Sequence, residues 1–449
     1  MSEGVGTVSM DTPPRLAVDR LLDDRETRII VCCGAGGVGK TTTAAALGVR
    51  AAGRGRKAVV LTIDPARRLA QSMGIDSLDN TPRKVETVGA GDGELHAMML
   101  DMKRTFDEIV EAHADGERAK AILANPFYQS LSAGFAGTQE YMAMEKLGQL
   151  RARDDWDLII VDTPPSRSAL DFLDAPKRLG SFLDGKFIRV LMAPAKVGGR
   201  AGMKFLNVGM SMMTGTLSKL MGASLLKDVQ TFVAAMDTMF GGFRTRADAT
   251  FRLLQAPGTA FLVVAAPEAD ALREAAYFVE RLAAESMPLA GLVLNRVHGS
   301  GADQLSAERA LAAAENLEEG GIVDQESGKA GLRDSGAEPK GTAETAGSAE
   351  TAQTAHSTRT TRTANPPETG SPGTEGDTAV VDRITAGLLR LHAERMQVIA
   401  RERRTRDRFT SLHPEVAVAE VAALPGDVHD LAGLRAIGER LAAGVPAGA

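Results

Sequence analysis

The sequence predicts an α/β fold with a mostly parallel sheet and helices on both of its faces. Short apolar runs of strand length alternate with helical segments along most of the chain. This alternation is typical of parallel sheets, whose strands are buried on both faces and joined by crossover helices. Because ligands bind beyond the carboxyl ends of the strands in open sheets of this kind, the residues that end the runs are the first candidates for a functional site.

Seven apolar runs are the expected strands. They are RIIVCC (28–33), AVVLTI (58–63), ELHAMML (94–100), DLIIVD (157–162), AFLVVAA (260–266), LAGLVLNRV (289–297) and EVAVAEVAAL (415–424). The first run leads into a helix at Lys40 and the fifth into a helix at Glu268. Polar residues stand at or near the ends of three runs, namely Asp64, Asp162 and Asn295. These three are candidates before any motif is considered.

Composition limits the classes of protein that remain. The chain has 449 residues, which suggests two or three domains or one domain with large insertions. No stretch approaches the roughly 20 apolar residues that cross a bilayer, and the first 20 residues do not resemble a secretory signal. Cys32 and Cys33 are adjacent, so we expect a cytoplasmic protein without disulfides. A net charge of −6 argues against nucleic acid as a partner.

Two segments interrupt the alternation of strands and helices. Residues 191–243 are rich in methionine and predict a helical subdomain. Residues 318–378 are rich in Ala, Thr, Glu, Gly, Ser and Pro, and such a composition buries too little apolar surface to fold, which predicts a disordered insertion. A strand and a helix follow the insertion. We therefore expect one domain over 28–449 that contains both segments, preceded by an N-terminal extension (1–27).

A glycine-rich motif follows the first strand. It fits G-x-x-x-x-G-K-[ST], in which backbone N–H groups surround phosphate oxygens, a lysine faces the β- and γ-phosphates, and a hydroxyl binds Mg²⁺. The motif also opens an Ala-rich helix, whose amino-terminal dipole favours anions. The alternative is a glycine-rich turn without a ligand. The predicted nucleotide-binding residues are Gly34, Ala35, Gly36, Gly37, Val38, Gly39, Lys40, Thr41 and Thr42, with Lys40 also catalytic.

Asp162 ends the run DLIIVD, where a second carboxylate is expected beside a phosphate-binding loop. In this position a carboxylate holds a water of the Mg²⁺ shell, so Thr41 and Asp162 are the predicted metal residues. The alternative is a strand-end aspartate that starts the turn at Pro164 and Pro165.

Asp64 lies 24 positions after Lys40, beyond the end of the second run. A carboxylate there could orient the attacking water and help to deprotonate it, so Asp64 is the second predicted catalytic residue. The alternative is a turn or a helix cap for residues 66–73. Asn295 could satisfy the polar edge of adenine, and the alternative there is an Asx turn.

Together these motifs resemble the arsenical pump-driving ATPases and the related ATPases that guide tail-anchored membrane proteins, which are deviant-Walker P-loop ATPases. The similarity spans nearly the whole chain except the insertion. The matching pieces are GAGGVGKTT (34–42), TIDPARRLA (62–70), VDTPPSRSALDFL (161–173), VLNRV (293–297) and ALPGDVHDLAGL (423–434).

The resemblance implies a role for each candidate residue and a set of partners. Asp64 would lie in the first switch and Asp162 in the second, and Asn295 and the backbone after Pro425 would bracket adenine. The implied cofactors are ATP and Mg²⁺. The implied partners are a second copy or a related subunit in a nucleotide-gated dimer, a hydrophobic protein client at residues 191–243, and a membrane surface. For that segment, ordinary core or interface packing is an equally good reading.

Three departures from the family pattern qualify these expectations. The family usually has a lysine that enters the partner's site where this chain has Ala35. The arsenite-binding cysteines and a C-x-x-C zinc motif are missing, and residues 165–168 of the second switch read PSRS. We therefore expect an ATPase that switches a dimer or a client-binding surface. The alternatives are a regulatory subunit that hydrolyses ATP poorly without a lysine-bearing partner, and a P-loop kinase.

Overall fold

The structure is a computed structural model that describes residues 14–63, 67–75, 77–86, 93–126, 128–129, 132, 138–164, 242, 245–320 and 375–443. The chain forms two compact units. The first combines residues up to 303 with those from 398 onward, and the second comprises 304–397. The first unit contains the sheet, and the described part of the second contains two helical segments.

An eight-stranded sheet forms the centre of the first unit, in the order β3-β4-β2-β5-β1-β6-β7-β8. Neighbouring strands pair in parallel except β3 and β4, which are antiparallel. The predicted α/β fold with a mostly parallel sheet is therefore confirmed. The strands are β1 (Ile29–Gly34), β2 (Lys57–Thr62), β3 (Arg83–Lys84), β4 (Glu94–Met99), β5 (Leu158–Asp162), β6 (Thr259–Ala265), β7 (Leu289–Val297) and β8 (Val418–Ala422).

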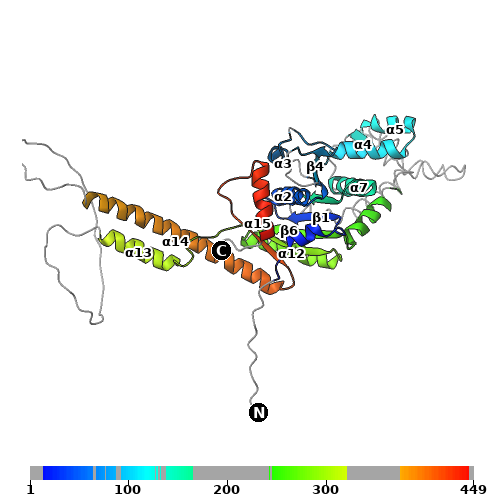
Figure 1. Cartoon of the computed structure of the whole chain (residues 1–449). Helices are drawn as coiled ribbons and strands as arrows, with labels where there is room; N and C mark the ends of the chain where they lie inside the picture. Colours follow the sequence, from blue (N-terminus) through cyan, green and yellow to red (C-terminus); the bar gives the residue numbers. More distant parts are fainter. Residues whose placement is uncertain are drawn as a thin grey trace, which may run out of the picture. The chain divides into compact units, whose positions relative to one another are not determined.

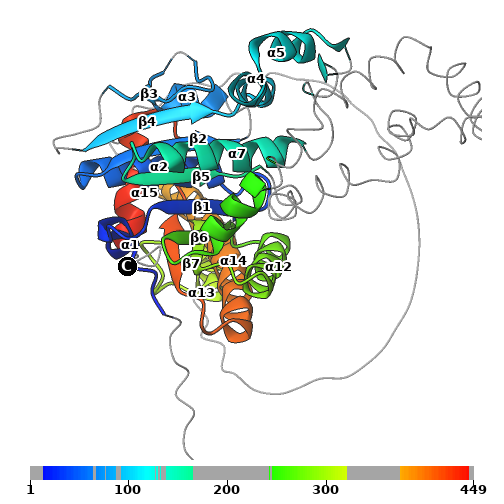
Figure 2. The same ribbon diagram turned by 90° about the vertical axis from the view of Figure 1, so that its right-hand side faces the viewer.

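Helices cover both faces of this sheet (Figures 1 and 2). Those on one face share a hydrophobic cluster and are α1 (Val18–Asp23), α2 (Lys40–Gly53), α3 (Arg67–Ser72) and α15 (Leu431–Ala443). Those on the other face are α4 (Met102–His113), α5 (Gly116–Leu123), α7 (Thr138–Arg153) and α12 (Ala269–Ala284).

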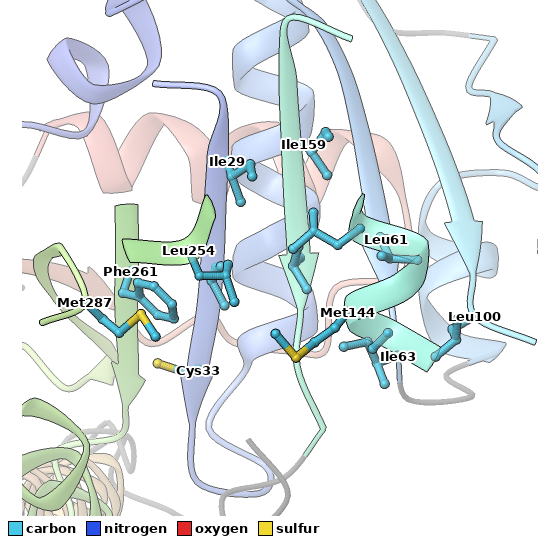
Figure 3. Close-up of a cluster of buried hydrophobic side chains, with 14 of the residues drawn as sticks. Ile29, Cys33, Leu61, Ile63, Leu100, Met144, Ile159, Leu254, Phe261 and Met287 are labelled. Carbon is cyan, nitrogen blue, oxygen red and sulfur yellow. The ribbon is translucent and has the colours of Figure 1, made fainter. Parts of the chain in front are cut away.

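Successive side chains of the central strand β1 point to opposite faces of the sheet and belong to two different hydrophobic clusters. Ile29, Val31 and Cys33 point into the cluster beneath α4, α7 and α12, while Ile30 and Cys32 point into the cluster beneath α2 and α15. Figure 3 shows the first of these clusters. Because both faces are buried, the strand reads as an unbroken apolar run.

The described part of the predicted N-terminal extension packs onto the sheet unit. The Leu16 N–H donates to the Val418 carbonyl at 3.0 Å, and the Val418 N–H donates to the Pro14 carbonyl at 2.9 Å. Val18 and Leu22 of α1 are fully buried. Residues 14–27 are thus integrated into the core, and residues 1–13 lie outside the described residues.

Arg56 holds this segment in place from inside the protein. Its side chain is 1% exposed. Its guanidinium donates to four backbone carbonyls, those of Leu22 at 2.8 Å, Asp24 at 2.9 Å, Thr27 at 2.7 Å and Asp157 at 2.6 Å. One buried cation therefore joins α1, the turn after it and the start of β5.

We expect Arg56→Met to lower the free energy of unfolding by about 3 kcal/mol, because buried carbonyls would lose their donors. Urea denaturation of the full chain measures this change. Arg25→Met is the matched control. Arg25 is an exposed arginine within residues 14–27, the segment that Arg56 holds, and its ion pair with Asp157 spans 3.4 Å. A loss below about 1 kcal/mol for Arg56→Met would show that water satisfies these carbonyls.

Two helices form the described part of the second unit. They are α13 (Ala307–Gly320) and the amino-terminal part of α14 (Glu375–Leu412), which lie side by side (Figure 1). Arg390 of α14 pairs with Glu318 of α13 at 2.5 Å, and the His392 Nε2 lies 2.8 Å from the Leu305 carbonyl. Helix α14 then continues into the first unit, where Ile399 and Phe409 are buried.

Both segments that interrupt the sequence pattern lie largely outside the described residues. Only Gly242 of the predicted Met-rich subdomain (191–243) is described. Of the predicted insertion (318–378), residues 321–374 are not described, while both ends continue α13 and α14. None of the described helices has the combination of length and apolar character that crossing a membrane requires.

Candidate functional site

The glycine-rich loop joins β1 to α2, and two of its glycines are required by close approaches. Gly34 has φ +145°, and a Cβ at this position would lie 2.0 Å from the Val264 carbonyl oxygen. Gly39 has φ +97° and precedes the first residue of α2, and a Cβ there would lie 2.2 Å from the Asn295 Nδ2. Only glycine fits both constraints. The loop therefore packs tightly on β6 and on the end of β7.

A pocket of about 680 Å³ lies against this loop. Its lining combines the loop and the start of α2 with the ends of β5, β7 and β8. Among the residues predicted from sequence, those that line it are Gly37, Gly39, Lys40, Thr41, Thr42, Asn295 and Pro425. The fold thus gathers these residues at the carboxyl edge of the sheet, where ligands of open α/β sheets bind.

Asp162 lies fully buried under this pocket, at the end of β5. Its Oδ2 accepts a hydrogen bond from the Thr41 hydroxyl at 2.7 Å and another from the Thr62 hydroxyl at 2.9 Å. Thr41 is the second residue of α2 and Thr62 ends β2, so three elements meet at one carboxylate oxygen. Thr62 was not predicted from sequence; the signal for it was a polar residue near the end of the apolar run before Asp64.

The Thr41 and Asp162 pair suits Mg²⁺ chemically. Mg²⁺ prefers oxygen ligands, and in nucleotide sites it takes one or two from the protein and completes its shell with water and phosphate oxygens. Among the described residues, no group of three or more His, Cys, Asp or Glu side chains could hold a metal by itself. A hydroxyl beside one carboxylate would suit an ion that completes its shell with water and the oxygens of a phosphate ligand.

Lys40 folds back onto the loop that precedes it. It is 6% exposed, and its Nζ donates to the Ala35 carbonyl at 2.7 Å. A buried ammonium group at the start of α2 adds its positive charge to the amino-terminal end of the helix dipole, so this end of the pocket favours anions.

Asn295 contacts the glycine-rich loop directly. Its Nδ2 donates to the Val38 carbonyl at 2.8 Å. The pairing of β7 with β8 shifts register after Asn295. Arg296 adopts φ +63°, a backbone conformation that residues other than glycine rarely take. This bulge aims Asn295 at the loop. One amide proton is thus committed to Val38, so the predicted contact of Asn295 with adenine would use the rest of the amide.

Asp64 lies outside the described residues, but the residue before it is held on both sides. The Ile63 N–H donates to the Asp162 carbonyl at 3.1 Å, and the Gln139 side chain donates to the Ile63 carbonyl at 3.1 Å. Gln139 sits at the start of α7 and was not predicted from sequence, because nothing local marks a contact across 76 residues.

His298 was also not predicted from sequence. It lines the pocket just after β7, and Glu402 of α14 binds it twice, accepting from its backbone N–H at 2.9 Å and lying 2.6 Å from its Nδ1. Arg406, one turn further along α14, pairs with Glu420 of β8 at 2.9 Å. The carboxyl-terminal part of α14 is thereby fastened to the two strands that end at the pocket.

The family model described as "Anion-transporting ATPase" matches residues 27–319, well over half of the chain. The chain belongs to the anion-transporting ATPase family. The match begins beside β1 and includes the glycine-rich loop, Asp162 and Asn295. Membership makes the chain an ATPase by family and its glycine-rich loop part of an ATP-binding fold.

Relatives within this ATPase family are distant. ATPase GET3 of Podospora anserina is 26% identical over 298 residues, which cover 65% of this chain and 80% of the relative. ATPase GET3 of Malassezia globosa is 31% identical over 173 residues, 38% of this chain and 49% of the relative. A Halobacterium salinarum protein provisionally named as an arsenical pump-driving ATPase is 28% identical over 203 residues, 43% of this chain and 31% of the relative. Two of these three relatives are therefore spanned over half of their length or less.

Both cysteines of this family member are unsuited to thiolate chemistry. Cys32 and Cys33 are buried in β1, and burial raises the pKa of Cys33 to about 12 and that of Cys32 well above its ordinary value. Both thiols therefore stay protonated at neutral pH, and the thiolate is the species that attacks electrophiles and binds arsenite.

We expect neither cysteine to react with iodoacetamide at pH 8 in the native protein, whereas both should react in denaturant. Mass spectrometry of the alkylated protein measures this. Labelling of the native protein at the rate of a free thiol would contradict the burial of β1.

Proposed function

We propose that this chain is a Mg²⁺-dependent ATPase that couples ATP binding and hydrolysis to a conformational switch in a dimer or in a client-binding surface. The observation that carries the proposal is the 2.7 Å hydrogen bond from the Thr41 hydroxyl to Asp162. It joins the phosphate-binding loop to the strand end that faces the same pocket, and Thr62 joins the end of β2 to the same oxygen.

Each residue of the site has a role in this proposal. Lys40 leaves the Ala35 carbonyl to pair with the β- and γ-phosphates. Thr41 and Asp162 hold Mg²⁺, which neutralises charge on the phosphates when bound. Asp64 orients the attacking water and accepts its proton. Asn295 and the backbone from Pro425 contact adenine.

The chemistry is coupled to conformation through the strand ends. Asp64 directly follows Ile63, whose N–H donates to the Asp162 carbonyl at 3.1 Å. A shift of the backbone at Asp162 would therefore reach the residue before Asp64. Loops that γ-phosphate contacts order and hydrolysis releases are the usual form of such switches.

The partners are proposed from the relatives and not from the residues of the nucleotide site. We propose a cytoplasmic protein that acts as a homodimer or pairs with a related subunit. Residues 191–243 are proposed to bind a hydrophobic client, which would also account for contact with a membrane surface. Methionine side chains suit a surface that repacks around varied apolar partners.

The second candidate function is an ATP-binding subunit that hydrolyses poorly alone and depends on a lysine-bearing partner. Ala35 favours it, because a methyl group cannot stabilise negative charge in a neighbouring site.

Asp64→Asn tests the proposed cycle. We expect ATP·Mg²⁺ to bind with unchanged affinity while hydrolysis slows by about 10²–10⁴-fold, the usual contribution of a water-orienting carboxylate. Nucleotide titration and steady-state ATPase rates measure the two effects, and sedimentation with ATP and with ADP reports the switch. The variant should stay in the ATP-dependent state.

Asp79→Asn is the control, since Asp79 is a half-exposed aspartate that follows α3 in sequence and pairs with Arg83. If binding and rate fell together in Asp64→Asn, Asp64 would belong to the structure or the metal shell. Equal sedimentation with ATP and ADP in the wild type would remove the proposed switch.

A further inference from the structure

One helix carries most of the exposed apolar surface in the described part of the molecule. Eight large apolar side chains are exposed there, and six of them belong to the first two-thirds of α14. Their exposed fractions run from 38% to 63%. The six are Val380, Val381, Ile384, Leu388, Leu391 and Val398. Apolar residues gathered on one surface mark an interaction site, whereas single exposed ones do not.

Four of these residues form a narrow stripe in the second unit, which we call the α14 seam: Val381, Ile384, Leu388 and Leu391. Their spacing of three, four and three residues is that of the a and d positions of a heptad. The seam does not face α13, because the residues of α14 that are fully buried are Ala386 and Ala393, on a different side of the helix. Helix α13 therefore leaves the seam uncovered.

The shape of the seam indicates that its partner is a helix. A face that lies on a lipid surface is broad, while a strict a and d stripe is the narrower contact of a coiled coil. Two positions that flank the stripe on one side are Gly387, which leaves open space, and the exposed Glu394. A narrow stripe with a small residue beside it fits a second helix at close range.

The sequence of the seam is complementary to itself when reversed. In an antiparallel pair, the twofold axis would cross the two helices at the height of residue 386. Val381 then meets Leu391 of the second copy, and Ile384 meets Leu388. Each layer then combines a β-branched side chain with a leucine, and all four residues are used on both copies. A twofold axis requires the same patch on both partners, and this patch meets that condition.

Charge selects the antiparallel orientation. The next seam position after Leu391 is the exposed Arg395. A parallel pair in register would place the two Arg395 side chains against each other in the contact, and like charges there are destabilising. In the antiparallel pair they lie at opposite ends, roughly 27 Å apart at 1.5 Å rise per residue.

We propose that the α14 seam binds the α14 seam of a second copy of this chain in an antiparallel coiled coil, so that two α13–α14 hairpins form a four-helix arrangement. This contact lies on the hairpin unit and involves no residue of the nucleotide pocket. It therefore forms with or without nucleotide, unlike the switch proposed above.

Sedimentation of the full chain without nucleotide tests the contact. We expect concentration-dependent association, with its midpoint shifted at least about tenfold upward in Leu388→Glu and in Leu391→Glu, because a buried carboxylate opposes burial of the seam. Tyr277→Glu is the matched control, since Tyr277 is 57% exposed but lies on α12. Midpoints that are unchanged in both seam variants would overturn the proposal.

Cross-linking tests the orientation. Val381→Cys and Leu391→Cys should each fail to cross-link with themselves through a short bis-maleimide, and should cross-link when the two variants are mixed. The native cysteines are buried and leave a low background. Self-cross-linking of each variant would mean a parallel pair, and no cross-link in the mixture would remove the contact.

Binding to vesicles separates the remaining alternative. We expect Leu388→Glu to sediment with vesicles of phosphatidylcholine and phosphatidylserine to the same extent as the wild type, because the seam is proposed to bind a second copy and any membrane contact is assigned to residues 191–243. Sedimentation that Leu388→Glu abolishes, without any effect of this variant on self-association, would assign the seam to a lipid surface instead and overturn the proposal.

Discussion

Replacing Lys40 by alanine should lower ATP turnover by at least about 10³-fold and greatly weaken ATP binding. Lys40 is the buried cation at the start of α2, and its Nζ donates to the Ala35 carbonyl at 2.7 Å. A carbonyl is a weaker partner than a phosphate anion, so the ammonium group is placed to move a short way onto a bound nucleotide. Without it, the phosphates lose the protein cation that faces them and keep only the helix N–H groups and the Mg²⁺ proposed at Thr41 and Asp162.

Two further variants separate charge from packing. Lys40→Met keeps most of the buried stem and should lose as much activity as Lys40→Ala, because the missing element is the charge. Lys120→Ala removes a lysine whose side chain is 78% exposed and should leave turnover unchanged. Fluorescent-nucleotide titration and phosphate release give the two quantities. Unchanged ATP affinity and turnover in both Lys40 variants would contradict the assignment of the pocket as the ATP site.

The strands could be located from sequence because burial on both faces leaves an unbroken apolar run. DLIIVD (157–162) became β5, Leu158–Asp162, and LAGLVLNRV (289–297) became β7 with the same bounds. The two exposed residues of β3, Arg83 and Lys84, carry no such pattern, and the pairing with β4 was not predicted. Helix α14 has 38 residues, and its full extent was not predicted: its first four residues were assigned to the insertion, and no helix bounds were assigned from there to Leu412.

Some residues of the site are marked by local sequence motifs, and others come together only through the fold. The glycine-rich motif and the aspartate at the end of DLIIVD are written in short stretches of sequence, and the structure brings Thr41 and Asp162 to 2.7 Å. The contacts of Gln139 with Ile63 and of His298 with Glu402 join residues 76 and 104 positions apart. No local pattern encodes such pairs, because Gln139, His298 and Glu402 are ordinary polar residues and Ile63 contributes only its backbone carbonyl, until the fold places the partners together.

Replacing Ala35 by lysine should raise the ATPase rate of the isolated chain, by up to about 10³-fold where dimers form, because a cation supplied to a partner's site is worth about 10³–10⁵ in such reactions. Ala35 occupies the place where the family usually has a lysine that enters the partner's site. The residue is 8% exposed, so the new side chain has to extend past the exposed Gly36 and Gly37 to reach solvent.

Ala35→Met separates the effect of charge from that of bulk, because methionine is nearly as long as lysine but uncharged. We expect no gain in this variant. Steady-state phosphate release, measured over a range of protein concentrations, should show a gain for Ala35→Lys that grows as dimers form, since the added lysine acts only on the second copy.

If the wild type hydrolyses ATP briskly alone and Ala35→Lys changes nothing, another cation supplies this charge, and the dependence on a lysine-bearing partner is removed. If Ala35→Lys is fast while the wild type is slow, the native chain in a mixed dimer would receive a lysine from its partner and offer none in return, so hydrolysis would occur mainly in the site built on Lys40 and Asp64 of this chain.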